Sequence, residues 1–175
     1  LSGAIAGASD SNHINNTDLT AAGVILNIPC YYDTGKDTTA VTVSGYTVGA
    51  SNYIKIYTPN NTTTEVNQSQ RHNGGWDNTK YRLVGQQDFG SLLTIGADYT
   101  RVDGLQLSIT YNGTSAHGIG WYQKSNVLIS NSIIQGCKGA GIVSGSGTIW
   151  NLLVYNCGQG IIANTWSTLY AYNCT

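Results

Sequence analysis

The sequence predicts an all-β protein whose short parallel strands stack in a solenoid, and two observations support this fold class. First, helical signals are scarce, because glycine interrupts nearly every window and no segment rich in Ala, Leu, Glu and Lys occurs. Second, a phrase of apolar, polar and small residues recurs every 17 to 20 residues and ends at Cys137, Cys157 and Cys174. A fixed period of this kind is the signature of a repeat architecture.

The length of the period selects the type of repeat. Helical repeat families need about 33 residues or more, and the chain lacks the Leu-x-x-Leu-x-Leu ladder of leucine-rich repeats. A coil of about 20 residues at ~3.3 Å per residue closes into three short strands and three turns. This is one rung of a parallel β-helix. We therefore expect Ile133, Leu153 and the Tyr170-Ala171 region to lie on stacked parallel strands.

Further strand signals occupy the upstream half of the chain, where short apolar or alternating segments are separated by turn-rich stretches. These segments are Val24–Leu26, Val41–Val43, Ile54–Ile56, Leu92–Ile95, Val102 and Leu105–Leu107. We therefore divide the single domain into an irregular N-terminal segment or cap at 1–23 and a parallel β-helix at 24–175. A loop insertion is expected around 59–80. The best helical candidate is the segment from Leu1 to Ala8.

The three cysteines of the repeat are expected to form a structural column. Stacked side chains on parallel strands stay ~4.8 Å apart, whereas the Cβ atoms of a disulfide lie about 3.8 Å apart. This geometry favours buried, reduced thiols in the core. Asn156 and Asn173 precede two of the cysteines and are expected to stack in the same place. His13, His72 and His117 belong to no Cys/His motif, so we expect neither a metal nor a cofactor.

Composition limits the function classes. Charged residues make up only 10% of the chain and the formal net charge is −1, which argues against binding to nucleic acid and electrostatic docking to membranes. No apolar stretch approaches the ~20 residues of a membrane span. A surface of Asn, Thr, Ser, Gln and Tyr instead indicates an extracellular, cell-surface or virion protein. The chain begins without Met, so we expect a processed chain or a segment whose partners are flanking rungs or other copies.

One resemblance covers about Val24 to Thr175. The runs Asn52–Pro59, Arg71–Trp76 and Lys80–Leu83, together with the repeats, resemble right-handed parallel β-helix proteins of the pectin-lyase-like superfamily. The most similar group consists of environmental bacterial and phage members that generally carry no assigned activity. The resemblance implies a right-handed, single-stranded β-helix. Because many members of the superfamily cut acidic polysaccharides, it also raises a polysaccharide lyase or glycoside hydrolase as the alternative function.

The positions of the acidic residues indicate whether the chain could be an enzyme. Hydrolysis of a glycoside needs two carboxylates facing one groove, and no Asp or Glu follows Asp103. Asp88, Asp98 and Asp103 are weak candidates, because all three sit beside turns. Polygalacturonases carry the motifs Asn-Thr-Asp, Asp-Asp, Gly-His-Gly and Arg-Ile-Lys. Here Asn16-Thr17-Asp18 matches the first motif, Ala116-His117-Gly118 matches only part of the third, and the other two are missing. We therefore predict a non-catalytic structural module: a stalk, adhesin, appendage or filament subunit, or virion fibre module.

Glycan binding is a further possibility. The segment from Arg71 to Arg82 is the densest in chemical groups, and an outward-facing tryptophan on a strand can stack on a sugar ring. The candidates are Arg71, His72, Trp76, Lys80, Arg82 and Trp150. The same loop side chains can instead pair locally and pack the loop, and this alternative stays open.

Glycosylation is possible at several sites. The Asn-x-Ser/Thr sequons begin at Asn15, Asn60, Asn61, Asn67, Asn112 and Asn173, with Asn60, Asn61 and Asn67 the expected surface acceptors.

Overall fold

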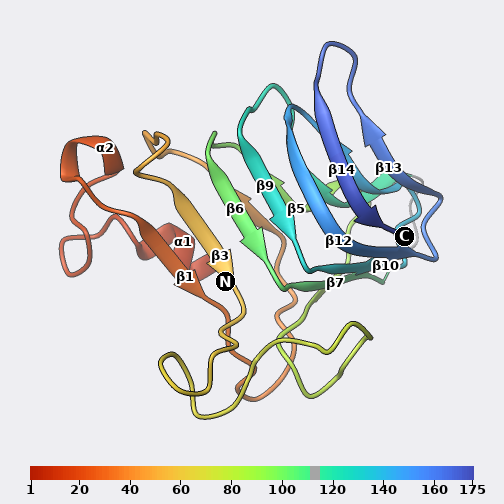
Figure 1. Cartoon of the computed structure of the whole chain (residues 1–175), viewed down its shortest axis with the longest axis horizontal. Coiled ribbons are helices and arrows are strands. Elements are labelled where there is room, and N and C mark those ends of the chain that lie inside the picture. The colour runs from red at the N-terminus through yellow and green to blue at the C-terminus, as the bar shows by residue number, and fades with distance from the viewer. Residues whose placement is uncertain (111–114) are drawn as a thin grey trace.

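The computed structural model describes residues 1–110 and 115–175, and this part of the chain is nearly all β, with 41% strand and 6% helix. Figure 1 shows a row of strands crossing the molecule, with the two short helices at the β1 end. The helices are α1 (Ser2–Gly7) and α2 (Leu19–Ala22). Among the described residues, neither helix has the length or the apolar character needed to cross a membrane.

Fourteen strands make up the described part of the fold. In chain order they are β1 (Leu26–Pro29), β2 (Val41–Val43), β3 (Ile54–Tyr57), β4 (Leu83–Gly85), β5 (Phe89–Ile95), β6 (Thr100–Asp103), β7 (Gln106–Ile109), β8 (Ser115–Gly120), β9 (Val127–Ser130), β10 (Ile133–Gln135), β11 (Ala140–Ser144), β12 (Gly147–Tyr155), β13 (Gln159–Ala163) and β14 (Leu169–Cys174).

These strands form three parallel stacks. The first stack follows the order β1-β3-β6-β9-β12-β14, and the second follows β4-β7-β10-β12. They join through β12, whose first half pairs with β9 and β14 and whose second half pairs with β10. The third stack is a separate sheet in the order β13-β11-β8-β5-β2. Every strand pair in the described residues is parallel, as expected from the sequence.

The core lies between the stacks and is built from alternate residues of each strand. In the first stack the aligned positions Ile56, Val102, Ile129 and Ile149 are all buried. Their neighbours in each strand point to the outer face, because successive side chains of a strand alternate, and most of them are polar or aromatic. At ~25 cal/mol per Å² of buried apolar surface, such a continuous column is the main stabilising element of the fold.

The irregular N-terminal segment is held by local caps and one ion pair. Asp18 caps α2, because its carboxylate accepts hydrogen bonds from the N–H groups of Thr20 and Ala21. Gly23 ends the helix in the left-handed conformation with φ 67°. The N-terminal ammonium of Leu1 pairs with Asp37 at 2.8 Å.

The predicted stacking on parallel strands is confirmed for all three repeats, but the register of the third differs from the prediction. Ile133 pairs with Leu153 on adjacent parallel strands, as expected. The last repeat, however, is aligned with the first half of β12, so Cys174 pairs with Leu152.

The expected column of three cysteines is therefore a pair, Cys137 and Cys157. Both follow strands in which Gln135 pairs with Tyr155, so they share one register. Cys174 is displaced because β12 is nine residues long and bends into the second stack before it reaches Cys157. β14 pairs with the part of β12 from Gly147 to Leu152, so Cys174 lies beside Leu152 and not beside Cys157. All four cysteines are free.

Candidate functional site

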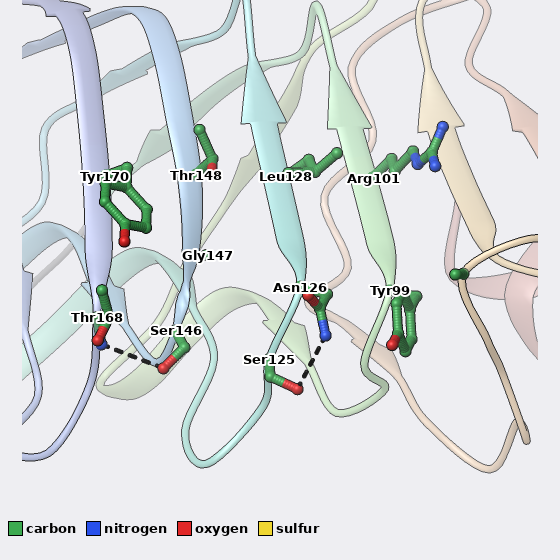
Figure 2. Close-up of a pocket in the computed structure, with 11 residues that line it drawn as sticks. Tyr99, Arg101, Ser125, Asn126, Leu128, Ser146, Gly147, Thr148, Thr168 and Tyr170 are labelled. Atoms are coloured by element: carbon green, nitrogen blue, oxygen red, sulfur yellow. Dashed lines mark hydrogen bonds between the residues drawn. The ribbon is translucent and has the colours of Figure 1, made fainter.

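The outer face of the first stack carries two rows of aligned side chains. The first row contains Lys55, Arg101, Leu128, Thr148 and Tyr170, each paired in register with the next. The positions on both sides of Lys55, Arg101 and Leu128 are buried, so these side chains face outward, and the strand register places Thr148 and Tyr170 on the same face. Figure 2 shows Arg101, Leu128, Thr148 and Tyr170 side by side on their strands. From Arg101 to Tyr170 the row crosses three strand spacings, or about 14 Å.

The second row lies two residues further along the same strands. It contains Tyr57, Asp103, Ser130, Trp150 and Tyr172. Trp150 is partly exposed beside the buried Ile149, which is the orientation that strand alternation predicts. Tyr172 is exposed next to it.

Both cations of the first row are stacked on tyrosine rings. The Arg101 guanidinium lies 3.4 Å from the ring centroid of Tyr53, and the Lys55 ammonium lies 4.2 Å from that of Tyr57. Cation–π contact fixes the direction of each side chain but leaves N–H groups free to donate at the surface. The face therefore offers preorganised donors between aromatic rings.

A groove of about 520 Å³ runs over this face and is lined by both polar and aromatic side chains (Figure 2). Tyr170 stands at one side and Tyr99 and Arg101 at the other, with Leu128 and Thr148 between them. One rim of the groove is formed by residues that come just before β9, β12 and β14. Two hydrogen bonds stiffen this rim: Asn126 Nδ2 donates to Ser125 Oγ, and Thr168 N donates to Ser146 Oγ.

A second hollow of about 530 Å³ continues this groove, because Ser125 and Ser146 line both. Its walls are the segments between β8 and β9 and between β13 and β14, which bring Tyr122, Lys124 and Trp166 together. Trp166 is 99% exposed and has φ 72°, a conformation that bulky residues rarely adopt. Exposed aromatic rings held in a polar groove provide the flat apolar faces and hydrogen-bonding edges on which sugars bind.

The loop between β3 and β4 contains most of the predicted glycan-binding residues, but the structure turns them inward. Arg71 donates to Asp103 and to the hydroxyl and carbonyl oxygens of Thr58. His72 is buried, and its Nε2 lies 2.9 Å from the carbonyl oxygen of Asn131. Burial of His72 lowers the pKa of its imidazole below the ordinary value, so the ring is neutral at pH 7. These side chains fasten the loop to the first stack.

The other loop candidates are also engaged locally. Trp76 Nε1 donates to Asn78 Oδ1 at 3.0 Å, and Lys80 Nζ donates to the carbonyl of Ser69 at 2.6 Å. Arg82 donates to the carbonyl of Asn78 and lies over the ring of Tyr32. Of the two interpretations left open by the sequence, these contacts favour local packing for this loop. The groove is therefore the better candidate site.

An amide ladder connects the loop to the end of the first stack. Asn173 Nδ2 donates to Asn151 Oδ1 at 2.7 Å, Asn151 donates to Asn131 at 3.1 Å, and Asn131 donates to Asp103 Oδ1 at 2.7 Å. The three asparagines all have φ near +50°, which asparagine tolerates better than other side chains. Asn173 therefore stacks on Asn151, not at the place of Asn156 as the sequence suggested.

Gly104 occupies the next position of the ladder, opposite Asn131. It has φ 82°, and a Cβ atom there would collide with Thr58 and the Arg71 guanidinium. Arg71 thus takes the place of the missing side chain and continues the ladder through its contact with Asp103.

The three candidate carboxylates have different surroundings. Asp103 accepts from Arg71, Asn131 and Ser130. Burial opposes its ionisation, but the hydrogen bonds from Asn131 and Ser130 and the charge of Arg71 together lower its pKa below the ordinary carboxyl value. Asp98 lies in the turn before β6 and accepts from the N–H and hydroxyl of Ser125. Asp88 precedes β5 in the third stack.

Metal-ligand clusters are missing from residues 1–110 and 115–175: no group of three His, Cys, Asp or Glu is suitably placed there. A thiol–thiol hydrogen bond with Cys157 and burial both raise the pKa of Cys137. His117 Nδ1 accepts from the N–H of Ala140 at 2.8 Å. Each of these groups has a packing partner.

The predicted glycosylation acceptors all lie on the surface of the β3–β4 loop. Asn60, Asn61 and Asn67 are exposed. Asn61 Oδ1 accepts from the N–H groups of Thr63 and Thr64, which leaves its Nδ2 available. The Asn112 sequon lies outside the described residues.

Comparisons with protein-family models, with curated proteins and with solved structures found no significant match to this chain. The groove was also missed by sequence reasoning, because Tyr99, Arg101, Tyr122 and Tyr170 are widely separated in the chain. Only the strand register brings them to one face. The available signal was the pairing of Arg101, at an outward position of an alternating strand, with Lys55 in the strand next to it.

Proposed function

We propose that this chain is a stretch of right-handed parallel β-helix that acts as a non-catalytic extracellular or surface module and binds a polysaccharide along the outer face of its first stack. The three parallel stacks and their recurring register support the β-helix. The handedness follows from the strong preference of parallel crossover connections for the right-handed form. The resemblance to pectin-lyase-like proteins belongs to the same proposal.

The observation that carries the binding proposal is the groove on that face. Its rings at Tyr99 and Tyr170, and at Tyr122 and Trp166 in the continuing hollow, offer stacking surfaces, while Arg101 offers donors. Sugars expose both apolar C–H faces and many hydroxyls, so they match a surface that mixes rings and hydrogen-bonding groups. The low charge of the whole chain also suits a ligand recognised by rings and hydroxyls.

Non-catalytic action is supported by the described carboxylates. Asp103 accepts hydrogen bonds from Ser130, Asn131 and Arg71, and Asp98 accepts from Ser125, so both carboxylates are engaged in holding the fold and neither is free to act as an acid or a nucleophile. The module can therefore hold a polymer without cutting it, as part of a stalk, adhesin, appendage or virion fibre. Its partners in such an assembly are flanking rungs or further copies of the chain.

The binding test compares two exposed aromatic residues. Affinity electrophoresis in gels containing neutral or uronate-rich polysaccharides identifies a polymer that retards the native protein. Tyr170→Ala should then weaken retention, because truncating an anchoring ring costs about 1 to 2 kcal/mol, or roughly 5- to 30-fold in affinity. Phe89→Ala is the matched control, since Phe89 is 79% exposed but lies in the third stack. Equal losses in both variants, or no retention by any polymer, would reject the groove as a glycan site.

A further inference from the structure

The β3–β4 loop contains an Asn-Gly pair, Asn73-Gly74, next to a buried histidine. In such a pair the glycine nitrogen can attack the asparagine side chain, because glycine adds no side chain that hinders the approach. The reaction is slow in ordinary peptides, since the amide nitrogen must first lose its proton. A base that accepts this proton removes the main obstacle.

His72 is placed as that base. Its Nδ1 accepts a hydrogen bond from the N–H of Gly74 at 3.1 Å. The opposite ring nitrogen, Nε2, lies 2.9 Å from the carbonyl oxygen of Asn131, an acceptor that fixes the proton on Nε2. The lone pair of Nδ1 therefore points at the proton that must leave. Burial also keeps the ring neutral, which is the form that can accept it.

The rest of the geometry leaves Asn73 free to react. Asn73 is exposed, and its side chain makes no hydrogen bond to any other described residue. Gly74 has φ 88° and open space around its Cα. His72 and Gly74 also line a hollow of about 240 Å³ that admits water.

We propose that Asn73 is a site of autocatalytic deamidation in which His72 is the general base. Nδ1 of His72 takes the proton from Gly74 N, and this nitrogen forms a bond to Cγ of Asn73. The Cγ–Nδ2 bond breaks, and Nδ2 leaves as ammonia with the proton returned by the imidazole. Water then opens the resulting succinimide at either carbonyl to give aspartate or isoaspartate. The net reaction consumes one water and releases one ammonia, and it places a new carboxylate two residues from Arg71.

Peptide mapping by mass spectrometry after incubation of the native protein at 37 °C measures this reaction at Asn73. The same chain unfolded in urea provides the reference rate, and Asn112-Gly113, the other Asn-Gly pair in the sequence, reports the rate of an unassisted pair in that unfolded chain. We expect Asn73 to react at least as fast in the native protein as in the unfolded one. Slower reaction in the native protein would mean that the hydrogen bond only closes the turn, and would overturn the proposal.

The decisive variant is His72→Gln, which can still donate to Asn131 but is not a base. We expect deamidation at Asn73 to slow at least fivefold. If this variant is too unstable to compare, the pH profile of the native protein gives an independent answer. General-base action by His72 predicts a rate that levels off above the pKa of the imidazole. An increase of about tenfold per pH unit throughout, as for hydroxide catalysis, or an unchanged rate in the variant would exclude His72 as the base.

Discussion

At the scale of single residues, the asparagines at the bend of the first stack do two jobs at once. Each of them has a left-handed backbone, and its side chain donates a hydrogen bond to the next strand of the stack: Asn173 to Asn151, Asn151 to Asn131 and Asn131 to Asp103. A side chain other than Asn, Asp or Gly pays a steric cost in this conformation. Asp103 then joins the amide ladder to Arg71, which fastens the β3–β4 loop.

The ladder can be tested at Asn151, which both donates and accepts. Asn151→Ala should destabilise the fold by about 2 to 3 kcal/mol, because it loses two hydrogen bonds worth ~1 kcal/mol each and acquires backbone strain. Asn151→Gly keeps the backbone relaxed, so it should lose only the hydrogen-bond part. Urea unfolding measures both. Asn126→Ala is the control, since Asn126 has φ 57° but no place in the ladder, and a loss as large as at Asn151 would contradict the ladder's contribution.

At the scale of elements, the strands differ in which of their residues are buried, and the long β3–β4 loop is held in place by side-chain contacts. β10 buries Ile134 in the apolar core and Ile133 on the opposite face, beside His72 and Gly74 of the β3–β4 loop. β9 leaves Leu128 partly exposed between the buried Val127 and Ile129. The β3–β4 loop has no strand of its own, yet Arg71, His72 and Gln106 tie it to the neighbouring stacks. Its polar groups are therefore structural.

Burial predicts a large loss of stability for one charge substitution and a small change for another. Ile133→Asp should prevent stable folding, because it buries an unpaired carboxylate at a cost of several kcal/mol. Leu128→Asp, one strand away in the chain but on the outer face, should change the free energy of unfolding by less than about 1 kcal/mol. Expression yield and urea unfolding distinguish the two, and similar stabilities would contradict the burial of Ile133.

The attachment of the loop through His72 predicts a dependence on pH. The folded state lowers the pKa of this imidazole, so the stabilising contribution is complete above the unfolded value of 6.5 and is lost as pH falls through the folded value. Asp103 behaves in the same direction at lower pH, below its ordinary value of 3.8. Urea midpoints should fall from pH 7.5 to pH 5, and less so in His72→Gln. An equal fall in the variant would assign the effect to other groups.

At the scale of the whole molecule, three parallel stacks enclose one apolar interior and leave a grooved outer face. Charges are few, and within the described residues the ion pairs are Leu1 with Asp37 and Arg71 with Asp103. Stability therefore depends on apolar columns and hydrogen bonds, which salt screens weakly. The groove crosses several strands, so its shape depends on all of them being in register.

This architecture predicts binding without cleavage. Incubation with pectin, polygalacturonate, alginate and bacterial exopolysaccharides should release no new unsaturated or reducing ends, because hydrolysis needs two free carboxylates and Asp98 and Asp103 are engaged by Ser125 and Asn131. Absorbance of unsaturated products and a reducing-sugar assay provide the measurement. Cleavage of one polymer that a single Asp98→Asn change abolishes would establish an enzyme in place of a passive module.

The sequence by itself determined the strand content, the parallel stacking of Ile133 on Leu153 and the inward columns, because alternation and period are local properties of the chain. It did not determine that Cys174 lies beside Leu152 or that Asn173 stacks on Asn151. Those positions depend on where β12 bends, which fixes the register of the following strand. The loop residues Arg71 and His72 offered two roles in the sequence, and only their tertiary partners selected anchoring. The groove was decided in the same way, since register between distant strands is what places Tyr99, Arg101 and Tyr170 on one face.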